Sequence, residues 1–210
     1  MATEDPQIQQ AMMEAEKKAA LAKKRIRHWT IEKRFEDDRF RSRNELTEEL
    51  PPLEQVQRAY ILTWREDGKA VVVRKGPPSE PWSLPTVEQD LDDPASRALP
   101  VGDDRKGFDG WLKETARELW GIEIKDWYQG ARLRLTSTLE ATDLPAGTER
   151  FIIFLCATAG SLDDIPDDVD WSRRSITTKE FVALLREHYA EFVELLDPVH
   201  DGYLIRQANA

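Results

Sequence analysis

The feature that most constrains the fold is a short helical pattern that stops at a glycine, in residues 111–124 (WLKETARELWGIEI). Leu112, Ala116 and Leu119 recur at helical spacing, so we expect all three side chains to lie on one buried face. We expect Asp109 to be the N-cap and Gly121 to be the left-handed residue that ends the helix. A strand is predicted to follow directly, within residues 122–135.

Other segments have the patterns of strands and of a closing helix. Residues 58–64 (RAYILTW) and 70–74 (AVVVR) are predicted strands, joined by a hairpin turn at Asp67 and Gly68. Residues 150–158 (RFIIFLCAT) are typical of a strand that is buried on both faces. Thr177 and Glu180 form a capping box before a last helix, which we expect over residues 178–196.

Two of these motifs resemble those of the Nudix pyrophosphohydrolases. The helix that ends at Gly121 and Ile122 is similar to the family's metal-binding helix, R-E-U-x-E-E-x-G-U, in which U is aliphatic. Residues 82–85 (WSLP) are similar to the W-x-L-P element that precedes that helix. Thr86 and Val87 stand where the family usually has two glycines, and β-branched residues do not adopt the positive φ that glycine permits.

The resemblance implies a fold class and a domain organisation. It covers roughly residues 56–197 and implies an α/β (α+β) fold, a Nudix-like α/β/α sandwich with a mixed sheet. The Nudix-like domain is expected over residues 51–210, with a loop insertion at 88–109. Residues 1–50 are expected to form a long, charged, helical N-terminal extension, because no proline or glycine occurs between residues 7 and 50.

Most of the family's catalytic carboxylates are missing from the helix. Anchored on Gly121, the pattern has Glu114 in place of the arginine and Thr115 in place of the first glutamate. Of the paired glutamates only Glu118 remains, because Leu119 fills the other place. Mg²⁺ requires several oxygen ligands in near-octahedral geometry. We therefore expect no catalytic residue, no metal site and no cofactor; if the chain is active, the residues are Glu114 and Glu118.

Bulk properties exclude several classes of protein. No run approaches 18 apolar residues, so we expect no membrane-spanning helix and no membrane partner. The first residues show neither a secretory signal nor an Arg-rich transit peptide. The single cysteine, Cys156, excludes a disulfide framework and is expected to be a buried thiol. Three scattered histidines give no metal-ligand spacing.

Charge is distributed unevenly along the 210 residues, whose net charge is −10. Residues 17–43 hold eleven Lys and Arg against four acids, ahead of an acidic body. Such asymmetry favours contact with a polyanion or a partner through this basic arm, although a solvated helix of mixed charge is an equal alternative. The candidate contact residues are Lys23, Lys24, Arg25, Arg27, Trp29, Lys33, Arg34, Arg39, Arg41 and Arg43. Trp29 and Phe40 are candidates for base stacking, and packing is the alternative that we favour for Phe40.

Three functions remain open. Within the Nudix fold, the charged extension and the depleted helix most resemble the Nudix-fold protein of the mitochondrial large ribosomal subunit. We therefore expect a non-catalytic structural component of that subunit, which contacts neighbouring ribosomal proteins and rRNA and lies in the mitochondrial matrix, or otherwise in the cytoplasm. One alternative is a divalent-metal-dependent Nudix hydrolase of nucleoside diphosphate derivatives, with Glu88 or Asp109 completing the metal site. The other is a nucleotide-binding or protein-interaction module, with a cleft lined by Trp82, Trp111, Trp120 and Trp127.

Overall fold

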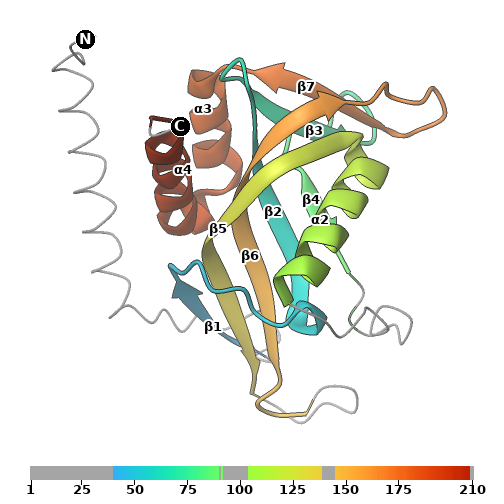
Figure 1. Cartoon of the computed structure of the whole chain (residues 1–210). Coiled ribbons are helices and arrows are strands. Elements are labelled where there is room, and N and C mark those ends of the chain that lie inside the picture. The colour runs from blue at the N-terminus through green and yellow to red at the C-terminus, as the bar shows by residue number, and fades with distance from the viewer. Residues whose placement is uncertain (1–39, 90, 92–103, 139–144, 209–210) are drawn as a thin grey trace, which may run out of the picture.

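A mixed β-sheet forms the centre of the molecule (Figure 1). The computed structural model describes residues 40–89, 91, 104–138 and 145–208. The strands are β1 (Phe40–Glu45), β2 (Val56–Arg65), β3 (Ala70–Lys75), β4 (Thr86–Glu88), β5 (Ile122–Ser137), β6 (Glu149–Leu162) and β7 (Trp171–Ile176). Their order is β1-β5-β6-β2-β3-β7, with β4 paired to β2 outside this path. The pairs are antiparallel except β2 and β6, which run parallel.

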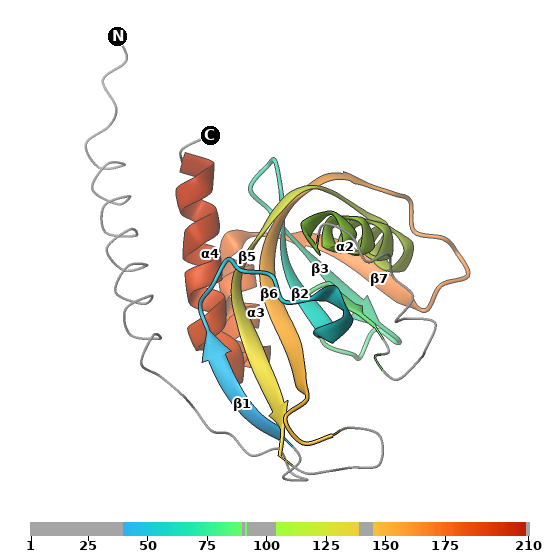
Figure 2. The same cartoon turned by 60° about the horizontal axis from the view of Figure 1, so that its bottom comes forward.

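Helices cover both faces of this sheet (Figures 1 and 2). Helix α2 (Asp104–Trp120) lies on one face, while α3 (Thr178–His188) and α4 (Val193–Ala208) lie on the other. Two 3-10 turns, η1 (Leu53–Gln55) and η3 (Ala190–Phe192), connect elements. This arrangement confirms the expected α/β/α sandwich. None of the helices in the described part of the chain is long and apolar enough to cross a membrane.

The core consists of two apolar layers, one on each side of the sheet. In β3, Val71 and Val73 pack in the layer under α2, whereas Val72 packs in the layer under α3 and α4. This is the period of two that a pleated strand imposes. In β6 both faces are covered, and Phe154 and Leu155 are fully buried on opposite sides. The prediction that residues 150–158 form a strand buried on both faces is therefore confirmed.

Local signals in the sequence placed several boundaries correctly. Gly68 has a φ of 74° and its N–H donates to the carbonyl of Arg65 at 3.0 Å, which closes the expected β2–β3 hairpin. Before α3, the Thr177 side chain accepts a hydrogen bond from the backbone N–H of Glu180. The Glu180 carboxylate in turn accepts one from the backbone N–H of Thr177, as a capping box requires.

The last helix is not continuous, contrary to the prediction for residues 178–196. Tyr189 has a non-helical backbone (φ −127°, ψ 29°) and separates α3 from η3 and α4. Its buried hydroxyl accepts a hydrogen bond from the N–H of Leu84 at 2.9 Å, and burial raises the pKa of Tyr189 to about 12. The helix is interrupted where the side chain is fixed to the W-x-L-P segment, a tertiary contact that helical periodicity does not reveal.

The expected N-terminal helix does not extend to residue 50. Residues Phe40–Glu45 form β1, an edge strand whose register pairs Phe40 with Ser137 and Glu45 with Arg132 of β5. Phe40 packs partly buried against the layer under α3 and α4, so the packing interpretation of this residue is confirmed. Residues 1–39, which hold most of the basic arm, lie outside the described part of the chain.

Candidate functional site

Helix α2 carries the candidate site and is anchored by its inner face. Phe108, Leu112 and Ala116 are almost completely buried against the sheet. Gly121 ends the helix with a φ of 57°, and its N–H donates to the carbonyl of Arg117 at 2.8 Å. The left-handed stop expected at Gly121 is confirmed.

Two predictions about this helix are wrong. Asp109 is not the N-cap, because α2 begins at Asp104 and Asp109 lies inside it. The Asp109 carboxylate instead accepts a hydrogen bond from the indole of Trp127 at 2.7 Å and pairs with Lys113 at 3.0 Å. Leu119 does not pack inward: 44% of it is exposed, because the helix ends within one turn and turns this position away from the sheet.

Arg173 of β7 holds the C-terminal end of α2 in place. Its guanidinium donates to the carbonyls of Trp120 and Gly121, the latter at 2.7 Å, and to the carbonyl of Asp163 at 2.5 Å. The last carbonyls of a helix have no partner within the helix, so this side chain supplies the missing donors. Partial burial lowers the pKa of Arg173. The sequence gave no local sign of this role, because the contact joins residues more than fifty positions apart.

The two carboxylates that remain from the family pattern, Glu114 and Glu118, are both exposed on α2. They lie four residues apart and so share one side of the helix. The neighbouring bases do not neutralise them, since Lys113 pairs with Asp109 and Arg117 pairs with Asp163 at 2.9 Å. The hydrogen bond to Asp163 raises the pKa of Arg117. Two free carboxylates therefore face solvent beside a fixed helix end.

The further carboxylates that were expected to complete a metal site have other partners. Glu88 pairs with Arg58 at 2.7 Å, and Asp109 is bound by Trp127 and Lys113. No group of three or more His, Cys, Asp or Glu side chains within the described residues is placed to hold a metal ion. The donor set on α2 in this part of the chain is thus limited to Glu114 and Glu118.

The W-x-L-P segment is structured differently from the family pattern. Thr86 and Val87, which replace the two glycines, are part of strand β4 and pair with Tyr60 and Ala59. The carbonyl of Thr86 accepts a hydrogen bond from the indole of Trp120 at 2.7 Å. An extended β-branched pair therefore closes against the α2 end where glycines would leave an open turn.

The four tryptophans expected to line one cleft do not lie together. Trp111, Trp120 and Trp127 are at most 9% exposed and belong to the apolar layer under α2. Trp82 packs against the opposite layer, where the guanidinium carbons of Arg74 and Arg174 each lie 4.5 Å from its ring centroid. These side chains are core anchors, and the Trp82 ring is held between cations.

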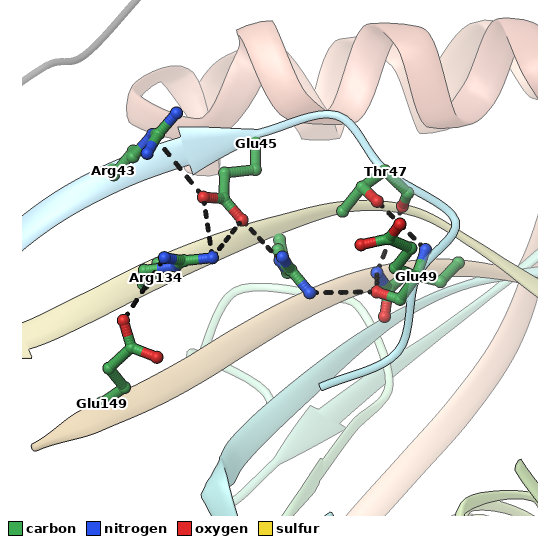
Figure 3. A network of polar contacts seen from close by, with 8 residues as sticks. Arg43, Glu45, Thr47, Glu49, Arg134 and Glu149 are labelled. Atoms are coloured by element: carbon green, nitrogen blue, oxygen red, sulfur yellow. Dashed lines mark hydrogen bonds and ion pairs between the residues drawn. The ribbon is translucent and has the colours of Figure 1, made fainter. Parts of the chain in front are cut away.

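The predicted contact residues of the basic arm are mostly outside the described chain. Lys23, Lys24, Arg25, Arg27, Trp29, Lys33, Arg34 and Arg39 all lie there. Arg41 and Arg43 lie on β1, and both are exposed. Arg43 belongs to an ion cluster around Glu45 (Figure 3), whose carboxylate also pairs with Arg132 at 2.6 Å and Arg134 at 3.2 Å. Arg134 reaches on to Glu149 at 3.3 Å.

A hollow of about 640 Å³ lies next to this ion cluster. Its lining is mostly polar and includes Glu149, which links it to Arg134, together with Glu54, Gln55 and Arg150. The sequence analysis did not identify this region, because it is formed by η1 and the start of β6, which are distant in the chain.

Comparison with known proteins gives similarities in structure alone. No protein-family model and no curated protein sequence matches the chain. A Nudix hydrolase from Nitrosomonas europaea is 13% identical with a TM-score of 0.43, over 71% of this chain and 88% of that one. The fold is Nudix-like.

Two further solved structures show the same Nudix-like fold. An Ap4A hydrolase from Caenorhabditis elegans, in a binary complex, is 16% identical with a TM-score of 0.41, over 70% of this chain and 96% of that one. A mutant of a pyrophosphohydrolase from Bacillus subtilis is 10% identical with a TM-score of 0.38, over 65% of this chain and 72% of that one. At these identities the likeness describes the fold and does not identify a substrate.

These findings contradict the function expected from the sequence. A structural role in the large subunit of the mitochondrial ribosome was predicted, but the solved structures that match are hydrolases and pyrophosphohydrolases. That prediction depended on short motifs and on the missing glutamates of α2. The loss of ligands in a helix describes what the helix lacks, and it does not identify an assembly.

Proposed function

We propose that this chain is a divalent-metal-dependent hydrolase of nucleoside diphosphate derivatives, and that Glu114 and Glu118 are the carboxylates that face the metal ion. One observation carries the proposal. These two side chains lie one helical turn apart on the exposed side of α2, and among the described residues neither is neutralised by a base. The role of non-enzyme that the sequence suggested is replaced by this reading.

The donor set fits one kind of metal site. Mg²⁺ is commonly bound by one or two protein carboxylates together with substrate phosphates and water. Glu114 and Glu118 are compatible with an ion that arrives on the diphosphate, and they are too few to hold an ion without it. When bound, the ion supplies charge neutralisation on the phosphates and polarises the bond that is attacked.

Other residues keep these carboxylates available and fixed. Arg117 lies next to Glu118 in the sequence, and its pairing with Asp163 directs its charge away from the two glutamates. Arg173 fixes the helix end by three backbone carbonyls, so the positions of Glu114 and Glu118 depend on a rigid element.

A second candidate function is binding of the same ligands without hydrolysis. The observation in its favour is that Glu88 and Asp109, the nearest candidates for a third ligand, are engaged by Arg58, Trp127 and Lys113. A site with two carboxylates supplies no obvious additional base to activate a water molecule.

The test is a pyrophosphohydrolase assay of the full chain with Mg²⁺ or Mn²⁺. The substrates are ADP-ribose, nucleotide sugars and Ap4A, the last being the compound named for one of the similar structures. We expect metal-dependent turnover, and a loss of about a hundredfold in kcat/KM in Glu118→Gln, because ion binding contributes several kcal/mol to the transition state. Glu187→Gln is the matched control, because Glu187 is an exposed glutamate on α3, on the other face of the sheet.

The two candidate functions give different results. Turnover that is unchanged in both Glu114→Gln and Glu118→Gln would show that the site assignment is wrong. Calorimetric binding of nucleotides without any turnover supports the binding function instead. Neither binding nor turnover with any of these ligands contradicts both.

A further inference from the structure

The outer corner of α2 exposes apolar side chains. Leu119 and Ile165 are the large hydrophobic residues reported as exposed in the described part of the chain, at 44% and 37%. Both belong to the same corner, because Asp163 is held to α2 by Arg117 and donates its N–H to the carbonyl of Gly121 at 2.8 Å. Figure 1 shows the β6–β7 loop beside the end of α2 that leads into β5. We call this surface the α2 corner.

Acidic side chains surround these apolar residues. Glu114 and Glu118 are exposed on the helix, and Asp164, Asp167 and Asp168 are exposed on the loop. Among the described residues no ion pair neutralises these loop carboxylates, whereas Asp163 is already paired with Arg117. An apolar centre with a charged rim is typical of an interaction site. Charge complementarity selects a basic segment that also carries large apolar side chains.

The chain itself contains such a segment. Residues 23–34 hold six Lys and Arg against one acid, Glu32, and they include Ile26 and Trp29. This part of the sequence is the basic arm that the proposed function does not use. Its charge and its apolar residues complement those of the α2 corner.

Distance decides which copy of the chain supplies the arm. Phe40 pairs with Ser137, at the opposite end of β5 from Ile122, where α2 ends. The 16 residues of β5 extend over about 50 Å at roughly 3.3 Å per residue. The 17 residues from 23 to 39, helical as their sequence predicts, would extend over only about 25 Å. A helical arm is therefore too short to reach the α2 corner of its own chain.

We propose that residues 23–34 of one copy dock on the α2 corner of a second copy. Applied in both directions, this contact gives a two-fold dimer in which each arm covers the partner's corner. Leu119 and Ile165 receive the apolar side chains of the arm, and the acidic rim pairs with its Lys and Arg. The inference does not depend on the proposed function, because its readout is assembly and not turnover.

The test is sedimentation velocity of the full chain over a range of concentrations, at low and at physiological salt. We expect a dimer that weakens as salt increases, because exposed charge pairs are screened. Charge reversal of the rim (Asp164→Lys with Asp167→Lys) or of the arm (Arg25→Glu with Arg27→Glu) is expected to raise the dimer dissociation constant about tenfold or more. Combining all four substitutions is expected to restore the dimer.

The matched control is Lys179→Glu with Arg186→Glu, which reverses two exposed charges on α3, on the other face of the sheet. It is expected to leave the dimer unchanged. Restoration in the fourfold variant separates docking from misfolding, since a misfolded rim variant would not be rescued by changes in the arm. A chain that is monomeric at every concentration and salt, or a dimer unaffected by either reversal, overturns the proposal. So does a fourfold variant that stays monomeric.

Discussion

Gly121 meets two constraints that no other residue satisfies together. Its φ of 57° lies in the left-handed region, and a Cβ at this position would lie 2.7 Å from a guanidinium nitrogen of Arg173. Gly121→Ala is therefore expected to lower the free energy of unfolding by about 1–2 kcal/mol from the backbone alone. Displacement of Arg173 adds to this loss. Urea denaturation measures the change.

A second glycine provides the control for this substitution. Gly68 also has a positive φ, of 74°, but a Cβ there would meet nothing within 4 Å. Gly68→Ala is expected to show the backbone cost without the displacement. Equal losses in the two variants would show that Arg173 adapts without cost to a side chain at position 121.

Glu45 is the residue on which the ion cluster of Figure 3 depends. Its side chain is 13% exposed, and that of its partner Arg132 is 11% exposed. Removing one partner of a buried pair leaves the other uncompensated. Glu45→Gln is expected to reduce the free energy of unfolding by about 3 kcal/mol. Glu48→Gln, at an exposed position three residues later, is the control and is expected to change it little.

At the scale of elements, the capping box of α3 predicts a pH dependence. Hydrogen bonds from Thr177, first from its backbone N–H and then from its hydroxyl, lower the pKa of Glu180. A carboxyl whose pKa is lower in the folded state stabilises the protein above its unfolded pKa. This stabilisation is lost as pH falls through the folded pKa. We expect the loss from about pH 5 downward, measured by chemical denaturation.

The matched variant for this prediction is Thr177→Ala. It removes the hydroxyl that donates to Glu180 and the oxygen that accepts from its backbone N–H. The difference in stability between wild type and variant is expected to shrink as pH falls. A difference that stays constant between neutral pH and pH 3 would mean that the carboxylate has no part in the cap.

Elements set by local sequence could be predicted, and elements set by distant contacts could not. The stop at Gly121, the capping box at Thr177 and the hairpin at Gly68 each depend on a few consecutive residues. The start of α2, the break at Tyr189 and the strand β1 depend on partners elsewhere in the chain. The sequence could place Glu114 and Glu118 on one side of a helix. It could not show that Glu88 and Asp109 have other partners, because those contacts are side chain to side chain across the fold.

At the scale of the whole molecule, the position of β1 limits where the chain can be shortened. A variant that lacks residues 1–39 keeps β1 and the Glu45 cluster, so we expect it to fold. A variant that lacks residues 1–50 loses the strand that pairs with β5 and is expected to melt at a lower temperature. Thermal denaturation of both variants checks this. Equal melting temperatures would show that β1 contributes little to stability.

The parallel pairing of β2 and β6 affects how the chain is completed during its synthesis. More than eighty residues separate the end of β2 from the start of β6, yet these strands lie side by side in the middle of the sheet. Until β6 has emerged, the early β2–β3 hairpin has no central neighbour, and its apolar residues stay open to other nascent chains. Slow closure of such a long loop makes this interval the time of greatest risk of aggregation, and holdase chaperones would act then.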